Sequence, residues 1–336
     1  MTGFRDSFDR RYRQLTHAGI NAMADGVSSR PTLSVVIASR DRQELLRACL
    51  ESVRRCTCEP HEIIVVDSAS HDPEATARVA REFRASFIRT DIPGAGLARN
   101  LGAVAARGEI VAFTDDDALV DAWWVDALMG TFADPSVDAS VGPVFVQGSE
   151  PPAAMRVGAT IDPTTDEARF SSADSGWFNR LAFGAIGYGA NLAVRRSTFE
   201  RYGLFRNCLG AGAPIPGDEN YFLFSLVSHG GLVVNEPRAR VTHPPQPPER
   251  IRELRRATLA YLLYVVSTQP HLFTKTVRHV MRRFSRDRRN APHGTRPGSW
   301  RLADLVQIVA AAPTLLFSAW QVERRLAKTV IAPHRS

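Results

Sequence analysis

The sequence predicts an α/β fold, in which a mostly parallel sheet is flanked by helices and followed by a helical C-terminal extension. Short apolar runs alternate with segments of helical spacing through the first part of the chain, which is the pattern of parallel βα units. Polar residues directly follow several of the apolar runs, as they do where strands end at a ligand site. Beyond residue 248 the strand-like runs stop and the composition becomes basic.

Strands and helices alternate from Leu33 onward, after a polar and partly helical leader of residues 1–30. Pro73 supports one helix start, because proline suits the first helical position and Asp72 before it can cap the chain. Right-handed crossovers would place these strands in one parallel sheet. The predicted strands are 33–38, 61–66, 86–89 and 110–114, and the predicted helices between them are 42–54, 73–84 and 96–106.

The order becomes mixed after residue 121, and the proline-rich segment 244–248 marks the end of this domain. The chain therefore divides into a leader (1–30), an α/β domain (31–248) and a basic helical region (249–336). Two or three helices are expected in the last region, with a loop near residues 290–299. The remaining predicted elements are helices 122–132, 197–202 and 219–228 and strands 139–146, 190–194, 231–235 and 239–243.

Charge is divided unevenly along the chain. Residues 1–248 hold 25 Lys and Arg against 30 Asp and Glu, whereas residues 249–336 hold 17 against 5. The basic excess includes an arginine-rich block at residues 282–289. Such a block suits an anionic surface, either a membrane leaflet or a nucleic acid, and a merely solvated basic face is the remaining interpretation.

Composition favours a protein of the cytoplasm. The four cysteines lack the paired spacing of a metal site, so reduced thiols are expected. The first 13 residues carry charges of both signs and no apolar core, unlike a secretory signal. The segment 302–320 is apolar but broken by Asp304, Gln307 and Pro313, which disfavours a membrane span. Together with the arginine-rich block it predicts peripheral contact with the inner face of a membrane. The alternative is a helix that packs on the α/β domain and covers its sheet.

Three consecutive aspartates, Asp115, Asp116 and Asp117, close the apolar strand 110–114. Carboxylates gathered at a strand end repel one another and destabilise the fold unless a cation offsets them. Mg²⁺ and Mn²⁺ accept such oxygen ligands and also hold substrate phosphates. A solvated acidic turn or a helix cap is the alternative. Polar residues also follow the strands 33–38 and 61–66, which favours a ligand site at this edge of the sheet.

From Leu33 to about His243 the chain resembles the inverting family 2 glycosyltransferases, whose fold is called GT-A. The order and spacing of the matching segments are specific, although each segment alone would be weak. The resemblance implies transfer of a sugar from a nucleotide-diphospho-sugar to an acceptor hydroxyl, in the synthesis of glycans, glycolipids or glycosides of secondary metabolites. The matching segments are 34–41, 63–70, 94–102, 108–117, 189–191 and 217–219.

The resemblance implies that the donor's base and ribose lie at the ends of the first two strands. The matching residues are Ala38, Ser39, Arg40 and Asp67. The family often has a second aspartate where this chain has Ser68, so the identity of the base stays open. Asp67 could also form a local turn with its own backbone.

The resemblance further assigns Arg99 to the diphosphate, because arginine and a helix N-terminus both favour anions. An exposed arginine on an amphipathic helix is the alternative. Asp117, Asp115 and His243 match the metal ligands, and Asp115 and Asp116 also lie on the nucleotide-sugar side. A Mn²⁺ or Mg²⁺ ion there would bridge the phosphates and assist departure of the nucleoside diphosphate. A lone histidine is more often structural, so His243 keeps both interpretations.

The acidic pair Asp218 and Glu219 opens an apolar helix and matches the family's catalytic pair. An inverting transfer needs one carboxylate to take the proton of the attacking hydroxyl. The family usually has Glu before Asp and this chain has the reverse, so the choice of base stays open. We assign Glu219 as the base and Asp218 as the residue that contacts or orients the acceptor. Helix capping by both is the alternative.

Acceptor contacts are expected from an aromatic side chain and from a segment of small residues. Of the neighbours Trp123 and Trp124, we expect one in the core and assign the acceptor contact to Trp124, although helical aromatics are more often core. Gly189 allows close approach of the backbone to a ligand, and Asn191 could bond sugar hydroxyls. The expected acceptor is a glycan, a lipid-linked sugar or a small molecule.

Two other functions remain open from the sequence. A nucleic-acid-binding or scaffold protein would use the arginine-rich block, but that block lies outside the motif-bearing domain and lacks interleaved aromatic residues. We therefore do not expect nucleic acid as a partner. A nucleotidyltransferase would share the acidic metal site, yet it would carry a glycine-rich phosphate loop after the first strand, and residues 39–42 contain no glycine.

Overall fold

The computed structural model describes residues 30–148, 168–174, 177–178, 188–245, 260–289 and 302–329. The predicted leader lies outside the described residues except for Arg30. Most of the proline-rich boundary at 244–248 and the predicted loop at 290–299 also lie outside them. The division of the chain at residue 248 therefore stays a prediction.

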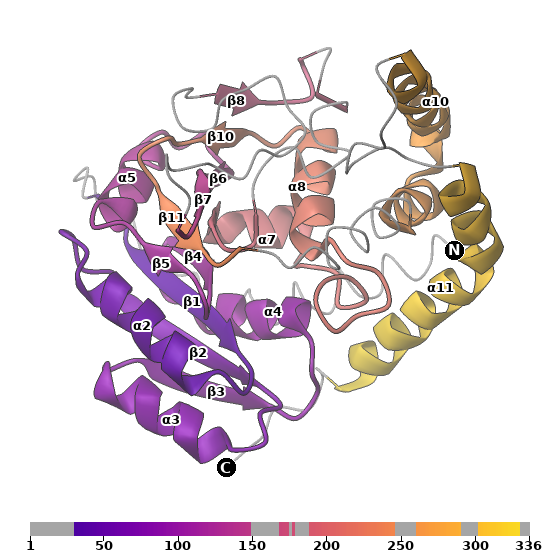
Figure 1. The fold of residues 1–336 in the computed structure, drawn as a ribbon. Helices are drawn as coiled ribbons and strands as arrows, with labels where there is room; N and C mark the ends of the chain where they lie inside the picture. Colours follow the sequence, from indigo (N-terminus) through magenta and orange to yellow (C-terminus); the bar gives the residue numbers. More distant parts are fainter. Residues whose placement is uncertain are drawn as a thin grey trace.

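An eight-stranded mixed sheet forms the centre of the α/β domain, in the order β3-β2-β1-β4-β9-β6-β10-β8. Its first four strands are parallel, as predicted. β9 runs antiparallel to its neighbours β4 and β6. The strands, drawn in Figure 1, are β1 (Leu33–Ser39), β2 (Glu62–Ser68), β3 (Ser86–Thr90), β4 (Ile110–Asp115), β6 (Ala139–Val141), β8 (Ala168–Phe170), β9 (Leu192–Arg195) and β10 (Val233–Asn235).

Helices cover both faces of this sheet, because successive residues of a central strand point to opposite sides. In β1, Val35 and Ile37 belong to one core cluster with residues of α2, α3 and α5, whereas Val36 belongs to a second cluster with residues of α4, α7 and α8. All three side chains are fully buried. These helices are α2 (Gln43–Arg54), α3 (Pro73–Glu82), α4 (Ala95–Ala105), α5 (Trp124–Thr131), α7 (Arg196–Tyr202) and α8 (Asp218–Ser228).

A small second sheet departs from the prediction. The segment 139–146, predicted as one strand, forms β6 in the main sheet and β7 (Val144–Val146) in a three-stranded sheet of order β5-β11-β7. Gly142 and Pro143 separate the two strands: proline offers no N–H to a ladder, and a Cβ on Gly142 would lie 2.1 Å from the carbonyl oxygen of Ala239. The other two strands are β5 (Leu119–Val120) and β11 (Val241–His243).

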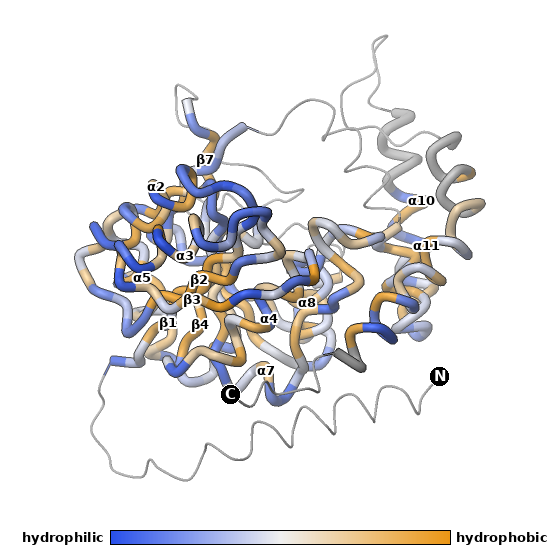
Figure 2. The backbone as a smooth tube through the Cα atoms, turned by 90° about the horizontal axis from the view of Figure 1, so that it is seen from below, coloured by the Kyte–Doolittle hydropathy of each residue, from blue (hydrophilic) through white to orange (hydrophobic). Residues whose placement is uncertain are grey.

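The C-terminal region is helical, as predicted. Residues 260–268 are helical and are followed by the short helix η2 (Pro270–Leu272), by α10 (Phe273–Arg289) and by α11 (Leu302–Thr329). Ala319 and Leu326 of α11 are buried, and Ala319 belongs to the same core cluster as α8. In Figures 1 and 2, α10 and α11 lie on one side of the molecule, beyond α8. Among the described helices, none is long and apolar enough to cross a membrane.

Candidate active site

The ends of the strands bring the predicted motifs to one edge of the main sheet. β1 ends at Ser39, β2 at Ser68 and β4 at Asp115, and these three strands are parallel neighbours. Because β9 runs antiparallel to β4, with Leu192 opposite Phe113, the residues just before β9 reach the same edge. The predicted convergence of strand ends is therefore confirmed.

Asp115, Asp117 and His243 form a cluster whose candidate ligand atoms all lie within 4.8 Å of one another. His243 Nε2 lies 3.1 Å from Asp117 Oδ1 and 4.0 Å from Asp115 Oδ2. On its other side, His243 Nδ1 lies 2.7 Å from the carbonyl oxygen of Pro244. A proton on Nδ1 would satisfy that carbonyl and leave the Nε2 lone pair toward the carboxylates, as in histidines that bind metals. The structure thus brings together the three residues predicted as metal ligands.

The cluster also perturbs its own titration. Burial lowers the pKa of His243, but the hydrogen bonds with Asp117 and Pro244 and the charges of Asp117 and Asp115 together outweigh burial and raise that pKa overall. Burial raises the pKa of Asp117, but His243 and the nearby guanidinium of Arg42 outweigh burial and lower it. Asp117 is therefore held as a carboxylate, which is the form that binds a cation.

Asp116 has a different role from its two neighbours. Its side chain is buried, accepts a hydrogen bond from Ser39 Oγ at 2.8 Å and receives another from Arg42 Nη1 at 3.1 Å. Burial raises its pKa to about 6, although the bonds from Ser39 and Arg42 oppose the shift. The side chains of Asp116 and Ser39 are thus bonded to each other inside the protein and offer little surface for the predicted nucleotide contact. Arg42, which also reaches Asp117 at 2.9 Å, was missed because it stands one residue beyond the motif.

Arg99 connects the aspartate triplet to the predicted catalytic pair. Its Nη1 donates to Asp218 Oδ2 at 2.6 Å and its Nη2 donates to Asp115 Oδ1 at 3.0 Å. The side chains of Arg99 and Asp218 are only 9% and 2% exposed, so the alternative of an exposed helical arginine is wrong. The guanidinium that was expected to meet a diphosphate is engaged by two carboxylates.

Two glycines make room for this ion pair. A Cβ on Gly189 would lie 2.4 Å from Nη2 of Arg99, and a Cβ on Gly210 would lie 2.6 Å from Asp218 Oδ1. Gly210 also has a φ of +102°, which residues with a side chain rarely adopt. The close approach predicted for Gly189 is therefore made to Arg99. Gly210 was missed, and its only signal in the sequence is its place in the glycine-rich loop at residues 210–212.

Glu219 stands in the first turn of α8 and is half-buried. Burial raises its pKa well above the ordinary glutamate value, and the negative charge of Asp218 raises it further, with Arg99 opposing. Its charge also contributes to raising the pKa of Tyr188 to about 12, although burial is the larger cause. Of the two acidic residues, Asp218 is committed to Arg99, whereas Glu219 has the elevated proton affinity.

Trp124 and Asn191 brace the interior and do not face an acceptor. Trp124 Nε1 donates to Asn191 Oδ1 at 2.9 Å, and Asn191 Nδ2 donates to the carbonyl oxygens of Ala239 and Pro143 at 2.7 and 3.1 Å. Both side chains are completely buried, whereas the neighbouring Trp123 is 59% exposed. The predicted acceptor contacts of Trp124 and Asn191 are wrong in this structure, because neither side chain has surface to offer.

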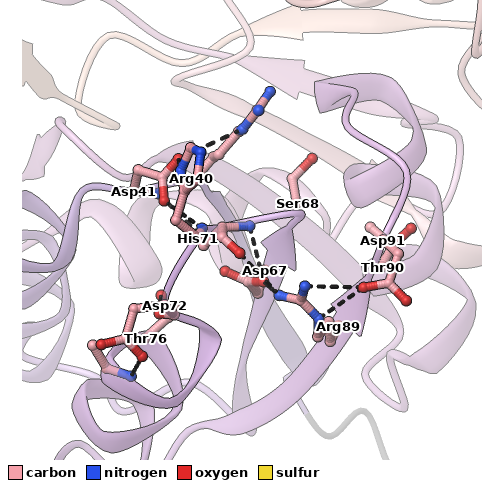
Figure 3. Close-up of polar contacts among 12 residues, drawn as sticks. Arg40, Asp41, Asp67, Ser68, His71, Asp72, Thr76, Arg89, Thr90 and Asp91 are labelled. Carbon is pink, nitrogen blue, oxygen red and sulfur yellow. Dashed lines mark hydrogen bonds and ion pairs between the residues drawn. The ribbon is translucent and has the colours of Figure 1, made fainter.

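The candidate contact for the nucleotide base is Asp67, which is fully buried near the end of β2 (Figure 3). Arg89 Nη1 donates to Asp67 Oδ2 at 2.5 Å, and the same oxygen accepts the backbone N–H of Ser70 at 3.3 Å. Within the described part of the chain, Asp67 Oδ1 has no hydrogen-bond partner. The local turn is therefore present, and one buried oxygen remains able to accept a further bond. Arg89 lies on β3, where the sequence shows no motif.

The neighbouring polar residues fix the shape of this region. Ser68 Oγ accepts the backbone N–H of Gly94 at 3.0 Å, so the residue that replaces the family's second aspartate holds the N-cap of α4. Arg40 is half-exposed and lies 3.7 Å from Asp41, whose carboxylate bonds His71 at 2.8 Å (Figure 3). Ala38 precedes them in β1 and is partly exposed.

Comparison with known proteins identifies the family of this chain. The family model described as glycosyl transferase family 2 matches residues 34–203. The chain is 34% identical to EpsH of Bacillus subtilis over 109 residues, which are 31% of each protein. It is 27% identical to the glycosyltransferase AglE of Haloferax volcanii over 197 residues, 56% of this chain and 60% of AglE. The chain thus spans less than two thirds of the length of these curated relatives.

Solved structures show the same fold. The Staphylococcus aureus protein TarS, residues 1–349, in complex with UDP-GlcNAc, superposes with a TM-score of 0.55 at 16% sequence identity, over 86% of this chain and 81% of TarS 1–349. At that identity the likeness shows the fold alone. Because the family model covers half of the sequence and the strands and helices follow the expected plan, the chain belongs to glycosyl transferase family 2 and has the GT-A fold.

Proposed function

We propose that this protein is a metal-dependent, inverting glycosyltransferase that moves a sugar from a nucleotide-diphospho-sugar to an acceptor hydroxyl. One observation carries the proposal: the Asp115, Asp117 and His243 cluster is joined through Arg99 to Asp218, beside a glutamate of raised pKa. The first group suits a cation with its phosphates and the second suits proton transfer. A transferase of this kind needs both at one place.

The three side chains proposed as metal ligands suit a divalent cation. Two partly exposed carboxylates and one imidazole lie within reach of a common point, and three protein ligands leave positions for phosphate oxygens. Carboxylates favour Mg²⁺ or Mn²⁺ among the common ions. Such an ion, when bound there, would neutralise charge on the departing diphosphate. Arg42 then has a separate role, since it donates to both Asp116 and Asp117 and its positive charge offsets theirs.

Glu219 is the base in this proposal. A carboxylate whose pKa is raised by burial and by a neighbouring charge holds a proton more strongly than a free one, which suits removal of the proton from an attacking hydroxyl. The hydroxyl oxygen attacks the anomeric carbon from the side opposite the phosphate, so the configuration inverts. Asp218, fixed by its ion pair with Arg99, lies beside Glu219 and orients the first turn of α8.

The nucleotide would lie between the ends of β1 and β2. Asp67 Oδ1 is a buried acceptor without a partner among the described residues, and an N–H of the base would satisfy it. The backbone of Ala38 and Ser39 and the half-exposed Arg40 border the same position. For the acceptor we propose a hydroxyl of a glycan, a lipid-linked sugar or a small molecule, reached at an anionic membrane surface on its cytoplasmic side.

A donor panel tests the metal site and the donor together. Thermal unfolding is followed with UDP-, GDP- and dTDP-sugars, with and without Mn²⁺ or Mg²⁺, because a ligand of the native state raises the melting temperature. We expect one nucleotide class to stabilise the wild type only with metal, and Asp117→Ala to abolish that shift. Glu74→Ala, which removes an exposed carboxylate of α3, is the control and should keep it. Full metal-dependent stabilisation of Asp117→Ala would contradict the proposed site.

A further inference from the structure

Helix α11 has two apolar faces with different surroundings. Ala319 and Leu326 are 1% and 4% exposed. Leu315, Leu316 and Val322 are partly buried and pack against the same core cluster as α8. This inner face attaches the helix to the catalytic domain. The sequence alone does not separate it from the outer face, because Leu316 and Trp320 both fit one helical spacing.

The outer face carries apolar residues that point to solvent. Val306, Phe317 and Trp320 are 60%, 56% and 45% exposed. Phe317 and Trp320 stack with ring centroids 5.7 Å apart. Pro313 is also exposed. It follows Val306 by seven residues and precedes Phe317 by four, and these spacings keep side chains on one side of a helix. We call Val306, Pro313, Phe317 and Trp320 the outer stripe. A continuous exposed stripe with paired aromatic rings is typical of a binding surface.

One arginine lies beside the outer stripe, and other basic residues are exposed on α10. The guanidinium of Arg324 lies 5.1 Å from the centre of the Trp320 ring. On α10, Phe273 and Val277 are 57% and 43% exposed, and Arg278 and Arg282 of the same helix are also exposed. The sequence of α10 holds seven Lys and Arg and one Asp. Figures 1 and 2 place α10 and α11 on the same side of the molecule, away from α2 and α3.

A hydrogen bond links α11 to the active site. Glu323 of α11 accepts the backbone N–H of Cys208 at 3.3 Å. Cys208 stands two residues before Gly210, where an added Cβ would lie 2.6 Å from Asp218 Oδ1. The helix that carries the outer stripe therefore also supports the loop beside the proposed catalytic pair.

We infer that the outer stripe of α11 and the exposed residues of α10 form a docking surface for an anionic lipid membrane. Apolar side chains for the headgroup boundary and arginines for lipid phosphates are the two features that hold an interfacial helix. Aromatic rings with an arginine beside them suit that boundary in particular. This surface would add a partner to the proposed function, on which the inference rests. Its test needs neither sugar donor nor metal, so the membrane surface and the transferase function can each fail separately.

Sedimentation of the full chain with vesicles tests the surface. We expect binding to vesicles of phosphatidylcholine with phosphatidylglycerol, and much less to phosphatidylcholine alone. Phe317→Ser/Trp320→Ser should weaken binding to the anionic vesicles about tenfold or more. Leu45→Ser/Val104→Ser removes two side chains that are 44% and 57% exposed elsewhere and is the matched control that keeps binding. Arg278→Gln/Arg282→Gln should weaken binding about fivefold for each charge removed.

A spectroscopic measurement locates the contact. Vesicles should shift tryptophan emission to the blue, and Trp320→Phe should reduce that shift while it retains vesicle binding. Equal binding to neutral and anionic vesicles, or wild-type binding by the Phe317→Ser/Trp320→Ser variant, would overturn the inference. A dimer in light scattering that disappears in that variant would assign the stripe to a second copy instead. A DNA or RNA gel shift that depends on the same residues would assign it to nucleic acid.

Discussion

The guanidinium of Arg99 donates to Asp218 Oδ2 at 2.6 Å, and this buried ion pair joins residues 119 positions apart in the chain. The same guanidinium holds Asp115. Motifs that the sequence presents as separate signals are therefore one electrostatic unit. A change at any of these three residues should be felt on both the metal side and the proton-transfer side of the site.

Arg99→Met should destabilise the fold strongly. It leaves the carboxylate of Asp218 buried without its cation, and loss of one partner from a buried pair costs about 3–5 kcal/mol. The free energy of unfolding in urea measures this cost. Arg47→Met is the control, because Arg47 pairs with Glu82 on the surface and an exposed pair contributes about 0.2–1 kcal/mol. If both variants lose a similar free energy of unfolding, the buried Arg99 pair stabilises the fold no more than an exposed pair does.

Gly189→Ala should reduce both stability and transfer. The added Cβ would lie 2.4 Å from Nη2 of Arg99, and the guanidinium cannot retreat without breaking a bond to Asp218 or Asp115. We expect a cost of about 1–3 kcal/mol, as for an overpacked core. Gly130→Ala is the matched control in α5, where the nearest atom is 4.0 Å away; it should be neutral or slightly stabilising. Unchanged unfolding and activity in Gly189→Ala would contradict the close packing.

Glu219→Gln should retain donor affinity and lose transfer by a factor of roughly 10² or more, because the amide cannot accept the proton. Donor binding by calorimetry and transfer by product formation are measured on the same preparation. If Asp218→Asn shows the larger loss of transfer with intact folding, Asp218 is the base. Small and equal losses in both variants would point to helix capping.

The rate of transfer should depend on pH through Glu219. Its pKa is raised, first by burial and then by Asp218, and the base must be unprotonated. The profile of kcat/KM against pH should therefore fall on the acid side at a pH above the ordinary glutamate value of about 4.3. Asp218→Asn removes a negative neighbour, so the acid limb of its residual activity should move to lower pH. If the acid limb stays at the same pH in Asp218→Asn, the charge of Asp218 does not raise the pKa of the catalytic base.

Asp67→Asn should weaken binding of the nucleoside diphosphate about tenfold or more, because its unpartnered oxygen is the proposed acceptor for the base. Asp91→Asn is a close control: Asp91 is bonded by the same Arg89, but its side chain is 85% exposed. Calorimetric titration with UDP and with GDP measures both variants. If the two substitutions have the same small effect, Asp67 serves the fold alone.

Local patterns predicted most of the fold. Residues 110–114 are mostly apolar on both faces and include three β-branched side chains, which is typical of a buried central strand. β5 has two residues and β8 has three, too few to produce any alternation, and neither was predicted. The division of 139–146 into β6 and β7 depends on a contact between Gly142 and Ala239, residues far apart in the sequence.

The site was predicted only in part, because contacts between distant elements leave no local pattern in the sequence. Residue type and strand ends identified Asp115, Asp117 and His243, and the structure brings them together. The sequence does not indicate which of the adjacent Trp123 and Trp124 points inward. Both side chains are apolar, and only tertiary packing decides between them. It also gives no sign that Arg42 and Arg89 pair with the buried carboxylates of Asp116 and Asp67, since an ion pair across elements leaves no local spacing.

The proposed metal site lies across a joint between two sheets. Asp115 ends β4 of the eight-stranded sheet, and His243 ends β11 of the three-stranded one. An ion held by both would act as a cross-link, so its binding energy would also oppose separation of the small sheet from the large one. Amide hydrogen exchange in β5 and β11 should then slow when metal is added. Exchange in the small sheet would therefore report metal binding without a sugar donor or an acceptor.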